Sequence, residues 1–170
     1  MRGLERVGRT LILLFLGITL GSGVVGGAAA GVVAASAGPP SVGALADIPT
    51  DYLALYQAAG AAYGVPWQIL AGIGKVESDH GRNPAAYHPN EAGAQGPMQF
   101  IPSSWARYRW ASGNPQPDVN NPRDAIFAAA AYLRVAGAPG NIPRAIYAYN
   151  HAWWYVDLVL RQARAYGYPG

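Results

Sequence analysis

Cysteine is absent from this chain of 170 residues, and charged residues make up only 12% of it. Without cysteine there is no disulfide framework, no thiol nucleophile and no site for a lipid-modified cysteine. Beyond residue 37 the charges nearly cancel, because nine basic residues face eight acidic ones, a balance of +1. A nucleic-acid surface is therefore not predicted.

Several catalytic motifs are missing as well. The three histidines, His80, His88 and His151, form no H-E-x-x-H pattern and no pair four residues apart, so we expect no metal site. The stretch "AGIGK" at 71–75 lacks the first glycine and the Ser or Thr of a phosphate-binding loop. "VESDHG" at 76–81 contains a serine but no nucleophile elbow and no triad spacing. We expect no cofactor.

The N-terminal 37 residues are apolar and begin with a basic cluster. Three arginines within the first ten residues precede the apolar run 11–20, and the small residues "ASA" at 35–37 resemble a cleavage site. Residues 1–37 are thus predicted to be a signal peptide or a signal-anchor transmembrane helix, whose residues 11–37 contact the membrane. Both readings place the rest of the chain outside the cytoplasm. A buried helix of a cytoplasmic protein fits the arginines and small residues poorly.

The remaining residues predict one helical domain. Residues 38–46, "GPPSVGALA", are expected to be a linker, and residues 47–168 an all-α domain of about six helices. No long stretch alternates with the period of two that strands show. Apolar periodicity, capping residues and Gly or Pro at the ends predict helices at 50–64, 65–81, 101–112, 120–137, 141–150 and 151–167.

Glu77 has an unusual position within the expected helix 65–81. It follows Ile69 and Ile73 at spacings of four residues, so its carboxyl group projects from the apolar face. A carboxyl group there loses solvation, and its pKa rises toward the range that suits a general acid. Beyond residue 37 the only other glutamate is Glu91. The alternative interpretation is a helix-end carboxylate that bonds to the backbone of a loop.

Three blocks of sequence carry a family resemblance. They are "VESDHGR" at 76–82, "NEAGAQGPMQFIPSSW" at 90–105 and "AIYAYNHAWWYV" at 145–156. In this order the blocks resemble the lytic transglycosylases of the goose-type lysozyme-like superfamily, especially the actinobacterial secreted form. The resemblance covers about residues 50–165 and implies a lysozyme-like helical fold.

The resemblance also implies site residues. It makes Glu77 the catalytic residue, and it assigns substrate binding to Ser78, Asn90, Met98, Gln99, Tyr149 and Asn150. Asn90 replaces a serine that is common in the family, and Pro97 replaces the usual leucine. By the same resemblance the hydroxyl of Tyr149 is expected near the Glu77 carboxylate, and Gln99 beside the acetamido groups of the sugar.

The implied reaction cleaves the β-1,4 bond between N-acetylmuramic acid and N-acetylglucosamine in peptidoglycan glycan strands and leaves 1,6-anhydro ends. A hydrolase is the alternative if a second carboxylate lies about 6.5–9.5 Å from Glu77. The candidates for it are Asp79, Glu91, Asp118 and Asp124. A third interpretation is a non-catalytic module that binds cell-wall glycan.

Five tryptophans could belong either to the core or to a glycan groove: Trp67, Trp105, Trp110, Trp153 and Trp154. Nothing in the sequence indicates the oligomeric state.

Overall fold

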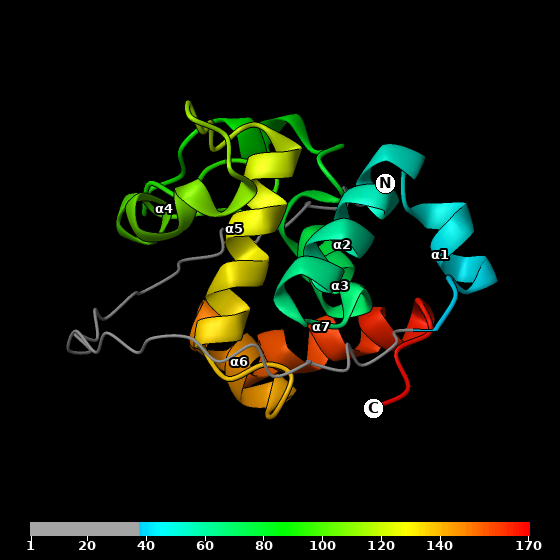
Figure 1. Cartoon of the computed structure of the whole chain (residues 1–170). Helices are drawn as coiled ribbons and strands as arrows, with labels where there is room; N and C mark the ends of the chain where they lie inside the picture. Colours follow the sequence, from blue (N-terminus) through cyan, green and yellow to red (C-terminus); the bar gives the residue numbers. More distant parts are fainter. Residues whose placement is uncertain (1–37) are drawn as a thin grey trace, which may run out of the picture.

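The computed structural model describes residues 38–170, so the predictions for residues 1–37 lie outside the described residues. Within this part the chain forms seven α-helices and two short 3-10 helices (Figure 1). The elements are α1 (Val42–Asp47), α2 (Thr50–Tyr63), α3 (Trp67–Ser78), η1 (Pro84–Tyr87), α4 (Pro102–Tyr108), η2 (Arg109–Ser112), α5 (Pro122–Val135), α6 (Ile142–Asn150) and α7 (Trp153–Ala165). No strand occurs among residues 38–170, where Gln95 and Phe100 form an isolated antiparallel bridge. The all-α prediction is confirmed.

Two helix boundaries follow directly from local sequence signals. Gly64 ends α2 in the left-handed conformation, with φ of 64°, as its lack of a side chain allows. At the start of α5 the side chain of Asn121 accepts hydrogen bonds from the backbone N–H of Arg123 at 2.9 Å and of Asp124 at 3.4 Å. These bonds satisfy amides that have no partner within the helix.

The end of α3 differs from the prediction. The helix stops three residues before Gly81, because Asp79 and His80 both adopt left-handed conformations with φ of 54°. The backbone N–H of Asp79 donates to the carbonyl of Lys75, and that of His80 donates to the carbonyl of Gly74, each at 3.0 Å. These bonds close the helix end. The expectation that the helix continues to Gly81 is therefore wrong.

The segment 38–46, expected to be a linker, contains most of α1. The Ser41 side chain accepts a hydrogen bond from the N–H of Ala44 at 3.0 Å and donates one to the carbonyl of Ala165 at 2.7 Å. Ala44 is fully buried. A local cap and contact with the end of α7 thus make this segment part of the folded domain.

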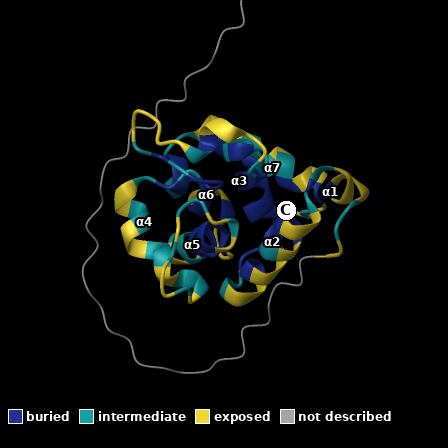
Figure 2. Ribbon diagram, turned by 90° about the horizontal axis from the view of Figure 1, so that it is seen from above, coloured by how far each residue is buried: buried dark blue, intermediate teal, exposed yellow. Residues whose placement is uncertain are grey.

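Helix α3 occupies the centre of the structure. Its residues 67–74 are all buried, and it packs against α2 and α7 (Figures 1 and 2). A Cβ atom on Gly72 would lie 2.8 Å from the carbonyl oxygen of Val159, and one on Gly74 would overlap the hydroxyl of Tyr56. The two glycines therefore allow α7 and α2 to lie close to α3, which fixes the helix whose last turn carries Glu77.

None of the helices within residues 38–170 combines the length and the apolar character that a membrane crossing requires.

Candidate active site

Glu77 lies in the last turn of α3, on the same face as Ile69 and Ile73. Both isoleucines are fully buried, whereas Glu77 is partly exposed. Burial of the carboxyl group raises the pKa of Glu77 from 4.5 to about 7, and a hydrogen bond from Tyr155 offsets only part of that rise. The carboxyl group can therefore be protonated near neutral pH and still meet a ligand at the surface.

Tyr155 is the direct hydrogen-bond partner of Glu77. Its hydroxyl donates to Oε1 of Glu77 at 2.6 Å, and its ring is fully buried in the first turn of α7. Sequence reasoning did not select Tyr155. Its spacing of four and eight residues from the buried Val159 and Ala163 would have placed it on the inward face of α7, although that pattern does not identify its partner.

Tyr149 has a different hydroxyl partner from the one expected. The hydroxyl donates to the backbone carbonyl of Met98 at 2.8 Å, and the buried ring packs edge-on against Tyr132 and Phe100. The expected bond to Glu77 is made by another tyrosine. Tyr149 is nevertheless close to the site, because burial and then the charge of Glu77 raise its pKa well above the usual value.

Ser78 joins the end of α3 to the loop that follows η1. Its hydroxyl donates to the carbonyl of Pro97 at 2.7 Å and accepts a hydrogen bond from the N–H of Gly81 at 2.8 Å. The side chain is buried. The structure therefore encloses Ser78 between helix and loop and does not present it at the surface, unlike the expectation for a substrate-binding residue.

Asn90 and Met98 have local roles in the same loop. The side-chain oxygen of Asn90 accepts hydrogen bonds from the N–H groups of Ala92 at 2.9 Å and Ala94 at 3.0 Å, which shape the turn. Asn90 is exposed, whereas Met98 is completely buried in the core beneath the site. Only Asn90 of this pair could reach a ligand with its side chain.

Gln99 borders a small surface pocket beside the site. Its backbone is left-handed, with φ of 50°, and its amide nitrogen donates to the carbonyls of Ala86 and Gly96, each at 2.9 Å. The pocket is lined by Gln99, Phe100, Ile101, Ser104, Tyr132 and Tyr149. Aromatic walls with a few polar groups suit a sugar or another partly apolar ligand.

Asn150 ends α6 directly after Tyr149. The residue is 7% exposed, and its amide is not among the buried side-chain groups of residues 38–170 that lack a hydrogen-bond partner. Its place at the end of α6, next to Tyr149, keeps Asn150 a candidate for contact with a ligand.

The other carboxylates considered for catalysis have separate surroundings. Asp79 forms ion pairs with Lys75 at 2.7 Å and Arg82 at 2.6 Å. Asp124 is buried and accepts hydrogen bonds from the Ser112 hydroxyl and from the Asn114 amide at 2.8 Å. Both carboxylates are occupied by structural contacts.

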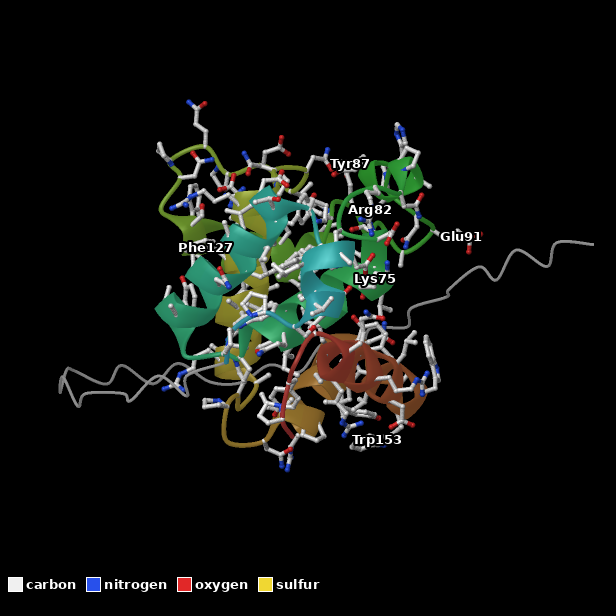
Figure 3. All side chains as sticks on the ribbon, turned by 90° about the vertical axis from the view of Figure 1, so that its right-hand side faces the viewer. Lys75, Arg82, Tyr87, Glu91, Phe127 and Trp153 are labelled. Carbon is white, nitrogen blue, oxygen red and sulfur yellow. The ribbon has the colours of Figure 1, made fainter. Side chains whose placement is uncertain are left out.

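Glu91 and Asp118 lie in loops. Glu91 is exposed, and its side chain projects away from the body of the molecule (Figure 3). Asp118 accepts a hydrogen bond from the N–H of Asn120 at 2.9 Å. Neither residue shares a hydrogen bond with Glu77, whose partner is Tyr155.

A charged cluster ties α1 to the end of α3. Asp47 of α1 pairs with Lys75 at 2.8 Å and Arg82 at 3.0 Å, and it accepts a hydrogen bond from the Tyr166 hydroxyl at 2.5 Å. His80 is buried beside the same hydroxyl at 2.9 Å, and burial lowers its pKa to about 4. Figure 3 shows Lys75 and Arg82 next to α1. The cluster holds the helix end that carries Glu77.

Within residues 38–170 no group of three or more His, Cys, Asp or Glu side chains is arranged to hold a metal ion.

The geometry can be compared with that of known proteins. The family model described as transglycosylase SLT domain matches residues 54–166. Two structures of the Escherichia coli lytic transglycosylase SLT35 are similar, one in complex with bulgecin A, with a TM-score of 0.54, and one in complex with calcium, with a TM-score of 0.51. Each is 18% identical in sequence, and each comparison covers 72% of this chain and 76% of the other. No protein with a curated description matches the chain. The likeness to SLT35 concerns the fold, and it confirms the predicted lysozyme-like helical class.

Proposed function

The chain belongs to the family of transglycosylase SLT domains and is a peptidoglycan lytic transglycosylase, and on this premise we propose that Glu77 is its single general acid and base. The three sequence blocks predicted this family, and the match over residues 54–166 confirms it. One observation carries the proposal for Glu77: a partly exposed carboxyl group whose pKa is raised by burial to about 7. Such a group is able to donate and accept a proton at the same pH.

The proposed reaction uses one carboxyl group twice. Protonated Glu77 donates its proton to the glycosidic oxygen, and the bond from that oxygen to the anomeric carbon of N-acetylmuramic acid breaks. The N-acetyl group of the same sugar stabilises the positive charge that develops. Ionised Glu77 then accepts the proton of the 6-hydroxyl while the oxygen of that hydroxyl bonds to the anomeric carbon. The product is a 1,6-anhydro sugar, and no water is consumed.

The residues around Glu77 divide into two proposed groups. Tyr155 orients the carboxyl group, while Ser78 and Tyr149 hold the carbonyls of Pro97 and Met98. These contacts support a positioning role, because a catalytic group needs a fixed geometry.

Gln99 and Asn150 are proposed to contact the sugar directly, together with the exposed Asn90. Gln99 borders the pocket, and Asn150 directly follows Tyr149, which also lines it. Met98 is completely buried, so we propose that it supports the pocket from below.

Mass spectrometry of peptidoglycan digested with the purified full chain tests the reaction. Anhydromuramoyl ends are expected. Reducing ends would instead identify a hydrolase. A hydrolase needs a second carboxylate, and those of Asp79 and Asp124 already form structural contacts. An intact substrate would support a glycan-binding module.

The role of Glu77 is tested by Glu77→Gln, with Glu91→Gln as the matched control. Loss of a general acid lowers the rate by about 10²–10⁴, whereas the exposed Glu91 should be replaceable. Turnover of Glu77→Gln within a few fold of the unaltered enzyme would contradict the assignment.

The substrate indicates where the enzyme works. Peptidoglycan lies outside the cytoplasmic membrane, so the domain acts in the cell envelope on glycan strands. Export by residues 1–37, and membrane contact by residues 11–37, stay predictions. A reporter fused after residue 40 should be active only outside the cytoplasm, and activity inside would contradict them.

A further inference from the structure

Two neighbouring tryptophans at the start of α7 are exposed. Trp153 is 60% exposed and Trp154 is 52% exposed, and Figure 3 shows Trp153 at the edge of the molecule. Large apolar side chains that gather at a surface often mark a binding site. These two residues therefore differ from Trp67, which is buried.

The ring of Trp153 is held in place although it is exposed. It stacks on Tyr147 of α6, with ring centroids 4.6 Å apart and an angle of 29° between the planes. His151 packs edge-on against Tyr147 on the same corner between α6 and α7. A ring that is already fixed loses little conformational freedom when a ligand binds to it.

Trp154 connects this surface with the proposed active site. It packs edge-on against Tyr155, with centroids 6.0 Å apart and an angle of 83°. Tyr155 in turn donates the hydrogen bond to Glu77. One side chain, that of Tyr155, therefore separates the exposed indole from the carboxyl group of Glu77.

Polar groups lie next to the rings on the same side of α7. Asp157 and Arg161 follow Trp153 at spacings of four residues and are both exposed, so the three side chains share one helix face. We call Trp153, Trp154, Asp157 and Arg161 the aromatic face of α7. Aromatic rings beside hydrogen-bonding groups suit a sugar, which has apolar ring faces and polar edges.

We propose that the aromatic face of α7 is a second binding surface for the glycan strand, taking an amino-sugar ring away from the bond that is cut. This inference rests on the proposed substrate and adds a contact to it. The surface would hold the enzyme on polymeric glycan.

A membrane fits this surface less well than a glycan. The face carries one acidic and one basic side chain, whereas surfaces that bind lipid carry an excess of cations. It also lies at the opposite end of α7 from α1, where the described chain begins, a distance of about 20 Å for 13 residues of helix (Figure 1). The rings are thus remote from residue 38, where the predicted membrane segment would join the domain.

The test is co-sedimentation of the full chain with purified peptidoglycan sacculi, in the Glu77→Gln background so that the polymer is not cut. Adding Trp153→Ala and Trp154→Ala together should weaken binding at least about fivefold, the scale of one or two aromatic contacts. Adding Trp110→Ala should leave binding unchanged, because Trp110 is 53% exposed but lies on η2, outside the aromatic face. Adding Trp153→Phe, which keeps a ring to stack on Tyr147, should retain most of the binding.

Equal binding of the double tryptophan variant and the Trp110 variant would overturn the inference. So would a loss of binding to phospholipid vesicles with no change on sacculi. Circular dichroism of each variant checks that it is folded, and Trp154→Ala alone serves if the double variant is not. Cleavage that persists in Glu77→Gln would refute the proposed catalytic role, whereas equal binding of the tryptophan variants to uncut sacculi would refute this inference alone.

Discussion

The hydroxyl of Tyr155 donates a 2.6 Å hydrogen bond to Oε1 of Glu77, across 78 positions of the chain. The bond joins the first turn of α7 to the last turn of α3. Burial raises the pKa of Glu77 to about 7, and the bond acts in the opposite direction because it favours the ionised carboxylate. The protonation of the proposed acid is therefore set by two opposed effects of the same surroundings.

Tyr155→Phe should move the alkaline limb of the pH profile of kcat/KM to higher pH. The change removes the hydrogen bond that lowers the pKa of Glu77, so the carboxyl group stays protonated further into the alkaline range. Turnover should fall roughly tenfold, because a hydrogen bond to a charged group is worth about 1.5 kcal/mol or more. The measurement is the complete pH–rate profile on peptidoglycan. A limb at the original pH would show that the bond does not tune the acid.

Tyr149→Phe provides the matched comparison. It leaves the buried carbonyl of Met98 without its donor, which should lower the free energy of unfolding by about 1–3 kcal/mol. The alkaline limb should stay in place, because this hydroxyl is not bonded to Glu77. Denaturant unfolding and the pH–rate profile are measured on one preparation. Unchanged stability together with a displaced limb would restore the role near the carboxylate that the sequence first predicted for Tyr149.

Glu77→Gln should make the protein more stable in alkaline solution. The ordinary pKa of a glutamate, as in the unfolded chain, is 4.5, and that of Glu77 in the folded protein is about 7. Between these two pH values the folded state therefore binds more protons than the unfolded state. Stability of the unaltered protein therefore falls as the pH rises through that window. Glutamine does not ionise, so the variant has no buried charge to stabilise. Its melting temperature should exceed that of the unaltered protein at pH 8 and nearly equal it at pH 4.

Thermal unfolding at both pH values checks this expectation, with Glu91→Gln as the exposed control. If Glu77→Gln and the unaltered protein keep the same difference in melting temperature at pH 4 and pH 8, burial does not raise the pKa of Glu77.

Asp47→Asn should destabilise the protein at neutral pH but not in strong acid. Burial alone would raise the pKa of Asp47, but hydrogen bonds from Lys75, Tyr166 and Arg82 outweigh it and lower the pKa from 3.8 to about 2. The stabilisation is therefore complete above about pH 4 and is lost as the pH falls toward 2. At pH 7 the expected loss is of the order of 1 kcal/mol, because the ion pairs are partly exposed.

Urea unfolding of Asp47→Asn at pH 7 and pH 2.5 measures this loss, and Asp51→Asn, on the exposed side of α2, is the control. An equal loss of stability at the two pH values would show that the ion pairs are not its source.

Local sequence was sufficient for most of the helices and for the face on which Glu77 lies. Gly64 ends α2 and Asn121 caps α5 through contacts within a few residues. Contacts of this kind can be predicted from the adjacent residues in the sequence. The spacing of Glu77 from Ile69 and Ile73 fixed its orientation for the same reason, since helical periodicity is local. The early end of α3 could not be read in this way.

Tertiary structure decided how the predicted site residues are used. Ser78 and Met98 belong to the predicted set, yet both are buried, because the loop packs over the end of α3. Ser41 lies in the segment that was predicted to be a linker, and its bond to Ala165 crosses 124 positions. That bond depends on where α7 ends in space, and it turned an expected linker into part of the domain.

The sequence by itself determined the family, the helical class and the identity of the proposed acid, because short motifs and periodic apolar positions encode them. It did not determine which tyrosine forms a hydrogen bond with Glu77. Tyr149 and Tyr155 are both buried, and each stands on a helix that could direct it toward α3. Only the packing of α7 against α3 brings the hydroxyl of Tyr155 to Glu77, while that of Tyr149 reaches Met98. A hydrogen bond requires two atoms within about 3 Å, and a distance of that kind between remote helices is set by the packed core, not by the residues next to either atom in the chain.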